Sequence, residues 1–243
     1  MFERFRQRSY ELEHIDRGDY TPEEYEGCMV ELRRVNRWLG DARALTRSVL
    51  PEIERDLSPE TEAGVTREFS LLDVGAGTGE LLREVTRRAR ARGVRAHLVG
   101  LELNERSARG ILEESRDFAE IAAVRGDALR LPFADAAFDY AMCSLLAHHF
   151  RDDEAVALLR EMSRVARRRV YVIDLHRHPV AYYFYTTVAR LFLHNRLIRE
   201  DGALSILRGF VPRELRRLAE RAGLTRAKVE RRFPYRLVLS ASK

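Results

Sequence analysis

The sequence is poor in cysteine and in lysine. Only Cys28 and Cys143 occur among 243 residues, so a disulfide framework is not indicated and a reducing compartment fits. Of the 43 basic residues only Lys228 and Lys243 are lysine, and the arginines are interspersed with 38 acidic residues rather than gathered in one tract. The net charge of +5 therefore does not predict a nucleic-acid-binding surface, and we do not expect nucleic acid as a partner.

Long apolar runs are also absent. No stretch reaches the roughly 18 uninterrupted apolar residues that a membrane span requires. The first six residues are charged from the third position and lack the apolar segment of a secretory signal. We therefore expect a cytoplasmic protein with no membrane span, either a monomer or a homodimer. The apolar content of 45% is sufficient for a full core in one domain with an appendage.

Glycine is concentrated after one apolar segment. Residues 69–74 predict a strand, and Gly75, Gly77 and Gly79 follow it before a helical run. Glycine is needed where a backbone turns sharply and where cofactor atoms approach the main chain. A dinucleotide-binding fingerprint would place a further glycine at position 80, but Glu80 stands there, and its carboxylate would lie near a pyrophosphate. The spacing therefore disfavours NAD as the cofactor.

The stretch Asp73-Val74-Gly75-Ala76-Gly77-Thr78-Gly79 resembles the first motif of class I S-adenosylmethionine (SAM) methyltransferases. Three later stretches resemble further motifs of that family in the same order, and they end the strands expected over 96–101, 121–124 and 138–143. An acid after the second strand accepts hydrogen bonds from the ribose hydroxyls, and the resemblance implies that the acid after the third accepts from the adenine amino group. The resemblance thus implies SAM as cofactor, held by Asp73, Gly75, Gly77, Gly79, Glu102, Leu103, Asp127, Ala128 and Cys143.

The alternation of strand and helix patterns predicts an α/β fold with a mostly parallel sheet. Crossover helices are expected over 79–92, 104–116 and 152–166, and the short turn between 227–232 and 236–241 predicts an antiparallel hairpin. Class I methyltransferases end their sheet in this way. The resemblance therefore implies a Rossmann-like, seven-stranded sheet in the order 3-2-1-4-5-7-6, with the last strand antiparallel.

The residues before this pattern read as helices. Thr21, Pro22 and Glu24 form the start signal of one helix, and apolar spacing predicts another over 41–57. We expect residues 1–64 to form an N-terminal helical cap and linker, and residues 65–243 to form the SAM-binding methyltransferase domain.

Two histidines follow the fourth strand. Ligands of doubly wound sheets bind beyond the carboxyl ends of the strands, so His148 and His149 should face the SAM methyl group. Either imidazole can act as a base towards a phenol or an enol, and we place His149 ahead of His148 as the catalytic residue. The alternatives are a structural role for each histidine and catalysis by proximity alone.

Further polar residues lie near the ends of the fourth and fifth strands. Asp174 is expected to orient a substrate hydroxyl or a histidine. Together with the two histidines it could be imagined as part of a metal site, since imidazole and carboxylate are suitable ligands. The spacing follows no ligand pattern, so we expect no metal. The other members of this group are Asp152, Asp153, His176 and His178.

Residues 179–194 are dense in aromatic side chains and read either as one core helix or as the wall of an apolar acceptor pocket. Their position resembles that of UbiE-like quinone and lipid-phenol methyltransferases, and we take Tyr182 and Tyr183 as substrate-binding residues. The expected activity is SAM-dependent methyl transfer to a small, largely apolar hydroxylated aromatic, polyketide or quinone-like acceptor, on oxygen or carbon, as in secondary metabolism. The alternatives are an RNA methyltransferase and a non-catalytic SAM-fold partner subunit.

The strand ends of a doubly wound sheet are open to solvent. An apolar acceptor bound there must be shielded from water during methyl transfer, so another part of the chain has to cover the strand ends. The aromatic segment and the N-terminal helices are the available parts of the chain. We expect them to meet over the SAM methyl group, with Phe5, Tyr10, Tyr20 and Tyr25 among the contacts.

Overall fold

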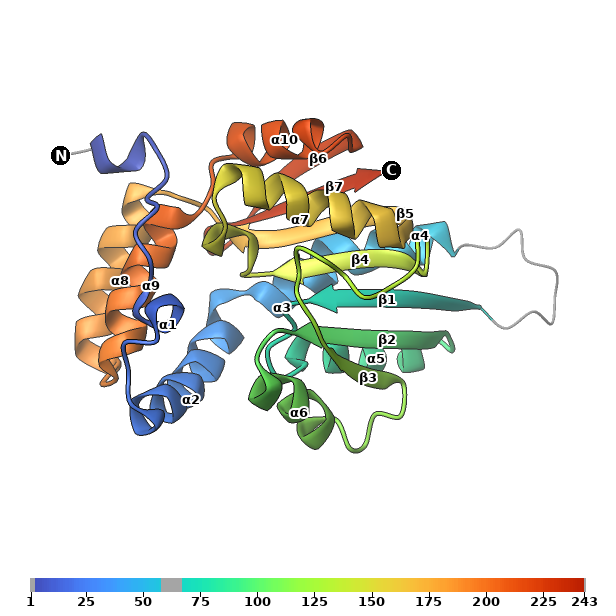
Figure 1. The fold of residues 1–243 in the computed structure, drawn as a ribbon, viewed down its shortest axis with the longest axis horizontal. Coiled ribbons are helices and arrows are strands. Elements are labelled where there is room, and N and C mark those ends of the chain that lie inside the picture. Colours follow the sequence, from blue (N-terminus) through green and yellow to red (C-terminus); the bar gives the residue numbers. More distant parts are fainter. Residues whose placement is uncertain (1–2, 58–66, 243) are drawn as a thin grey trace.

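A seven-stranded sheet forms the centre of the protein, and the computed structural model describes residues 3–57 and 67–242. The strand order is β3-β2-β1-β4-β5-β7-β6 (Figure 1), which confirms the predicted order. All neighbours are parallel except β7, which runs antiparallel to both β5 and β6. The strands are β1 (Glu68–Val74), β2 (Arg95–Glu102), β3 (Ile121–Arg125), β4 (Phe138–Ser144), β5 (Ala166–Leu175), β6 (Thr225–Arg232) and β7 (Arg236–Ser242).

Helices cover both faces of the sheet because the central strands are apolar on both sides. On one face, Leu72 and Ala141 belong to a buried cluster with side chains of α7 (Asp152–Val165) and α10 (Pro212–Arg221). On the other face, Leu71 and Tyr140 pack in a second cluster with side chains of the crossover helices that flank β2. These helices are α5 (Glu80–Ala91) and α6 (Glu105–Glu114).

The helices before β1 divide into two groups. The later group, within residues 41–56, packs directly on the sheet. Its side chains Leu45, Val49 and Ile53 are buried in the cluster that contains the β1 residue Leu71. This group therefore contributes to the core of the sheet rather than to a separate cap. The predicted border between residues 64 and 65 lies outside the described residues, and the division into two domains stays a prediction. The group comprises α3 (Asp41–Ala44), the π-helical η2 (Leu45–Val49) and α4 (Leu50–Asp56).

The earlier group of helices, between residues 14 and 39, belongs to a helical layer beyond the carboxyl ends of the parallel strands (Figure 1). It contains α1 (His14–Arg17) and α2 (Pro22–Leu39), and the layer is completed by α8 (Pro179–Phe192) and α9 (Arg196–Arg208). Thr21 caps α2 and forms the expected capping box with Glu24.

Residues 5–17, here called the N-terminal strap, run along α8 and α9 (Figure 1). The Ser9 N–H donates to the Leu207 carbonyl at 3.0 Å, which ties the strap to α9. A short 3₁₀ turn, Glu3–Phe5, leads into it. The strap therefore lies at the edge of the sheet where a doubly wound fold places its ligands. None of the helices in the described part of the chain has the length and apolar character to cross a membrane.

Candidate functional site

The loop after β1 is shaped by its three glycines. Gly75, Gly77 and Gly79 have φ angles of +74°, +59° and +78°, a left-handed region that other residues enter only at a cost. The Gly75 N–H donates to the Leu101 carbonyl at 2.8 Å, so the loop is anchored on β2. A Cβ placed on Gly77 would meet no atom within 4 Å. At Gly77 the loop therefore presents open backbone at the carboxyl edge of the sheet.

Acidic side chains lie beside this loop. Glu102, at the end of β2, accepts a hydrogen bond from the Gly77 N–H at 2.6 Å. Burial raises the pKa of the Glu102 carboxyl, although hydrogen bonds from the backbone partly offset it. Asp73 is almost wholly buried at the end of β1. Burial, and secondly the charge of Glu102, raises the pKa of Asp73 to about 8.

Two buried polar atoms at this edge lack partners. Asp73 Oδ1 and Ser144 Oγ accept or donate no hydrogen bond within the part of the chain that the structure describes. They lie on the adjacent strands β1 and β4, and strand alternation puts them on the same face as Leu71 and Tyr140. A buried polar group without a partner costs about 1–3 kcal/mol. The two atoms therefore mark a place where a bound molecule would supply the missing hydrogen bonds.

The other residues expected to contact the cofactor lie along the same edge, and their side chains range from exposed to fully buried. The Leu103 side chain is 68% exposed after β2. Asp127 is exposed after β3, and its Oδ1 accepts from the Leu129 N–H at 2.8 Å; Ala128 is half-buried beside it. Cys143 is fully buried in the cluster under α7, and burial raises the pKa of its thiol well above the usual value. Only the backbone of Cys143 is therefore available to a ligand.

This edge fits SAM. The cofactor carries an ammonium and a sulfonium and no phosphate, and the edge presents the carboxyl groups of Asp73, Glu102 and Asp127. The partnerless Asp73 Oδ1 and Ser144 Oγ are groups that such a molecule would satisfy. A pyrophosphate would bring negative charge next to the acidic Glu102 and Asp127, which agrees with the disfavoured NAD.

The histidine pair lies in a short 3₁₀ helix, η3 (Ala147–His149), directly after β4. His148 is 3% exposed, and its Nδ1 lies 2.7 Å from Oδ1 of Asp174 on β5. The His148 backbone N–H also donates to Asp174 Oδ2 at 3.1 Å. Burial alone would raise the pKa of the Asp174 carboxyl, but the neighbouring His148 outweighs burial and holds that pKa below its usual range. Asp174 thus fixes the orientation of a histidine, one of its two expected roles.

His149 is oriented by a residue that the sequence did not indicate. Its Nδ1 lies 3.0 Å from Oδ1 of Asp16, on the N-terminal strap. Burial would lower the pKa of the His149 imidazole, but the hydrogen bond to Asp16 and nearby carboxylates outweigh it and raise that pKa. The two imidazole rings lie side by side, with centroids 4.3 Å apart. Each ring is therefore held through Nδ1 by a different carboxylate.

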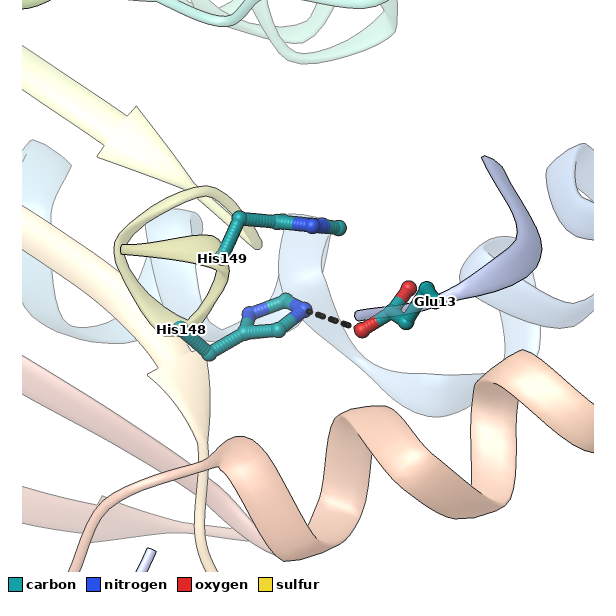
Figure 2. A group of neighbouring side chains, drawn as sticks. All are labelled: Glu13, His148 and His149. Atoms are coloured by element: carbon teal, nitrogen blue, oxygen red, sulfur yellow. Dashed lines mark ion pairs between the residues drawn. The ribbon is translucent and has the colours of Figure 1, made fainter. Parts of the chain in front are cut away.

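The strap brings a third group to the pair. Glu13 is buried, and its Oε1 lies 3.9 Å from Nε2 of His148 (Figure 2). The Ser205 hydroxyl donates to the same Oε1 at 2.8 Å. The spacing of the sequence predicted no metal, yet one ligand atom each of Glu13, His148 and His149 lies within 4.8 Å of the others, close enough to hold an ion.

Two buried arginines fasten the strap to the histidine turn. Arg208 of α9 donates to the backbone carbonyls of His148 and His149 and pairs with Asp16 at 2.6 Å. Arg8 of the strap donates to the Phe150 carbonyl at 2.9 Å and pairs with Asp152 at 2.6 Å. Neither arginine was expected from the sequence. Because arginine is frequent on the solvated helix faces of this chain, no local signal separates these two from the rest.

The strap and α8 meet through aromatic rings. The Phe5 ring lies edge-on to Tyr182 and Tyr183, with centroid distances of 5.6 and 6.1 Å. Arg4 donates to the Tyr182 hydroxyl at 3.1 Å. Tyr20 and Tyr25 instead stack on each other at 5.3 Å. The expected aromatic contact between the two segments thus forms at Phe5.

The other histidines of the expected polar group, His176 and His178, contact residues other than the histidine pair. The rings of His176 and His178 are 5.5 Å apart, and His178 stacks on Tyr235 of the β6–β7 turn at 5.1 Å. Burial, with the charge of His178 as a lesser cause, lowers the pKa of His176 to about 4. Asp153 pairs with Arg221 of α10 at 2.6 Å, on the surface. The contacts of these residues therefore do not join them to the histidine pair.

Comparisons with known proteins match part of this chain to methyltransferases. Residues 71–169 match the family model of a methyltransferase domain. A demethylmenaquinone methyltransferase of Roseiflexus sp. (strain RS-1) is 37% identical over 113 residues, which are 45% of this chain and 44% of the relative. The chain thus spans less than half the length of this relative.

Solved structures share the fold at low sequence identity. Magnesium protoporphyrin IX methyltransferase from Synechocystis PCC 6803, with bound SAH, has a TM-score of 0.56 and 17% identity over 84% of each chain. The CurJ carbon methyltransferase has a TM-score of 0.66 and 11% identity, over 94% of this chain and 62% of that one. At these identities the likeness concerns the fold alone. Together, the matched segment, the glycine loop and the sheet order show that this chain carries a class I SAM-dependent methyltransferase domain, part of which is similar in sequence to demethylmenaquinone methyltransferase.

Proposed function

We propose that the protein transfers the methyl group of SAM to a small, largely apolar acceptor that carries a hydroxyl group on an aromatic, polyketide or quinone-like framework. The observation that carries the proposal is the buried His148–Asp174 pair at the carboxyl ends of β4 and β5. The pair lies on the same edge of the sheet as the glycine loop and Glu102. A polar pair beside the methyl donor suits an acceptor that must lose a proton.

The proposed cofactor contacts follow the strand ends. SAM supplies an electrophilic methyl group on its sulfonium. Glu102 would accept from the ribose hydroxyls, Asp127 from the adenine amino group, and Asp73 would face the cationic part. The remaining proposed contacts are with Gly75, Gly77, Gly79, Leu103, Ala128 and the backbone of Cys143.

The proposed acceptor site lies between the histidine pair and the strap. Methyl transfer is an in-line displacement, so much of its rate comes from holding the acceptor opposite the sulfur. Phe5, Tyr182 and Tyr183 would supply an apolar wall that excludes water. Nδ1 of each histidine is engaged by a carboxylate. Nε2 of His148 faces the buried Glu13, whereas the partly exposed His149 would present its Nε2 to the acceptor. We propose that this pair activates the acceptor hydroxyl.

The relatives support this acceptor class without fixing it. The curated relative acts on demethylmenaquinone by its name, and one structural neighbour is a carbon methyltransferase. Transfer to oxygen and transfer to carbon both need an acceptor that has lost a proton. The histidine pair is compatible with either product.

The test is incubation of the full chain with methyl-labelled SAM and a panel of phenols, enols and reduced naphthoquinones, followed by mass analysis of the organic extract. We expect one acceptor class to be methylated, and His149→Ala to lower turnover by about 10²–10⁴ with SAM affinity unchanged. His97→Ala is the matched control, since His97 pairs with Glu68 at the amino ends of β1 and β2.

Two outcomes would contradict the proposal. Label in RNA from a lysate, with none in small molecules, would identify an RNA methyltransferase. Saturable SAM binding with no methylated product in the panel or the lysate would identify a non-catalytic partner subunit.

A further inference from the structure

We propose that Glu13, His148 and His149 bind one divalent transition-metal ion. Two imidazoles and one carboxylate, with positions left open, are the protein ligands of many catalytic zinc and non-haem iron(II) sites. The three residues come together only in the folded chain, because Glu13 lies on the strap and the histidines follow β4 (Figure 2). No sequence motif predicts this ligand set.

The distances suit an ion with little rearrangement. The three ligand atoms lie within 4.8 Å of one another, and Glu13 Oε1 is 3.9 Å from His148 Nε2. A tetrahedral ion with bonds of about 2.0–2.2 Å holds its ligand atoms roughly 3.3–3.6 Å apart. Small side-chain movements would therefore close the site around the ion. Figure 2 shows both imidazoles projecting from the turn after β4 towards the strap.

The surroundings prepare both histidines as ligands. Asp174 contacts Nδ1 of His148 at 2.7 Å, and Asp16 contacts Nδ1 of His149 at 3.0 Å. When a carboxylate accepts the Nδ1–H, the lone pair of a neutral imidazole is on Nε2. A histidine ligand whose other nitrogen is held by a carboxylate is a recurring arrangement around metal ions, because the carboxylate fixes the ring and increases its basicity. Two such pairs side by side are the strongest argument for an ion here.

The charges around the site also favour a cation. The carboxylates of Glu13, Asp16 and Asp174 carry three negative charges, and the facing guanidinium of Arg208 carries one positive charge. Arg8, which reaches the same turn, is paired with Asp152. The carboxylates therefore outnumber the guanidinium groups that face them, and a bound cation would offset this excess. Arg208 lies 3.8 Å from Glu13 Oε1, so the protein itself offsets part of this acidic charge.

An ion at this position would act on the acceptor. An acceptor oxygen bound at an open position has a lower pKa, as water does on catalytic zinc. The two histidines would then activate the acceptor as ligands rather than as bases. This catalytic part rests on the proposed function, whereas the binding of metal does not.

The binding test uses the full chain without SAM or acceptor. The metal-free protein is titrated with Zn²⁺ by calorimetry, and with Co²⁺ while its visible absorption is recorded. We expect one equivalent of Zn²⁺ and a Co²⁺ spectrum of low coordination number. Glu13→Gln and His149→Gln should each weaken Zn²⁺ binding at least tenfold, while Glu11→Gln, an exposed strap position, should leave it unchanged.

The glutamine at position 13 keeps an acceptor for the Ser205 hydroxyl, so the strap should stay in place, and circular dichroism verifies the fold of each variant. Two results would overturn the site. One is less than one equivalent of bound Zn²⁺ in the wild type, and the other is a Zn²⁺ affinity of Glu13→Gln and His149→Gln equal to that of the wild type. Methyl transfer that is unaffected by chelators would overturn the catalytic part alone. Stoichiometric Zn²⁺ binding without any methyl transfer would leave the metal site standing and refute the proposed function.

Discussion

Glu102 accepts a 2.6 Å hydrogen bond from the Gly77 N–H, which joins the end of β2 to the loop after β1. The acceptor capacity of a carboxylate is about four lone pairs, so this contact leaves capacity for a ligand. The same hydrogen bond fixes the orientation of the side chain. The carboxylate is therefore already placed between the glycine loop and the outer edge of the sheet.

Replacing Glu102 should weaken SAM binding. Two charge-assisted hydrogen bonds of about 1.5–3 kcal/mol each are lost in Glu102→Ala before water compensates, so we expect at least a tenfold increase in Kd by calorimetry. Glu68→Gln, at the amino end of β1, is the control. Unchanged affinity in a folded Glu102→Ala variant, or tight NAD binding by the wild type, would contradict the assigned cofactor site.

Asp73 should make stability depend on pH. Burial raises its pKa to about 8 in the folded state, against about 3.9 in an unfolded chain. Between these values the folded state holds the proton and the unfolded state does not, so stability falls as pH rises from about 4 to about 8 and then levels off. Asp73→Asn removes this dependence. The difference in Tm between the variant and the wild type should grow from pH 5 to pH 8, and a constant difference would contradict the raised pKa.

Arg208 should hold the strap on the histidine turn. Arg208→Met removes one donor each from the His148 carbonyl, the His149 carbonyl and the Asp16 carboxylate. Breaking a buried ion pair costs about 3–5 kcal/mol, which denaturant unfolding would detect. Arg199→Met, at an exposed position of the same helix, should change stability by less than about 0.5 kcal/mol. Equal effects of the two substitutions would show that the strap contacts contribute little.

Removing residues 1–20 should affect acceptor use more than the folding of the sheet. Among the residues that the structure describes, the two apolar clusters on the sheet contain none before Ala44. The arginines that face the strap would become accessible to water. Turnover with a phenolic acceptor should be lost, and Tyr183→Ala should reduce it. A truncated protein with full activity would exclude the strap from the acceptor site, and one that fails to fold would place the strap in the core.

Local patterns were sufficient to predict the sheet. Apolar strands, the glycine loop and the short turn before β7 each depend on residues close in sequence, so the strands and the antiparallel hairpin were predicted correctly. The order of the strands came from the resemblance to class I methyltransferases, and the structure confirms it. The helices over 41–57 were predicted as elements, but an amphipathic pattern does not say which surface it covers. Leu45 and Ile53 turned out to pack on the sheet.

The contacts around the histidine pair join segments that are far apart in the sequence, so local patterns do not predict them. Glu13 and Asp16 reach the histidines from the far end of the chain, and Arg208 reaches them from α9. Such pairings depend on how the strap crosses the sheet edge, which leaves no periodicity or spacing in the sequence. The sequence could therefore indicate His148, His149 and Asp174 by their position after strands, but not the groups that orient them from the strap.

The most direct test of the account is a crystal structure of the full chain with SAH. We predict the ribose hydroxyls on Glu102, the adenine beside Asp127, and the sulfur turned towards His148 and His149 under the strap. SAH bound away from the glycine loop, or with its sulfur facing away from the histidine pair, would contradict the placement of the methyl donor and the acceptor on this edge.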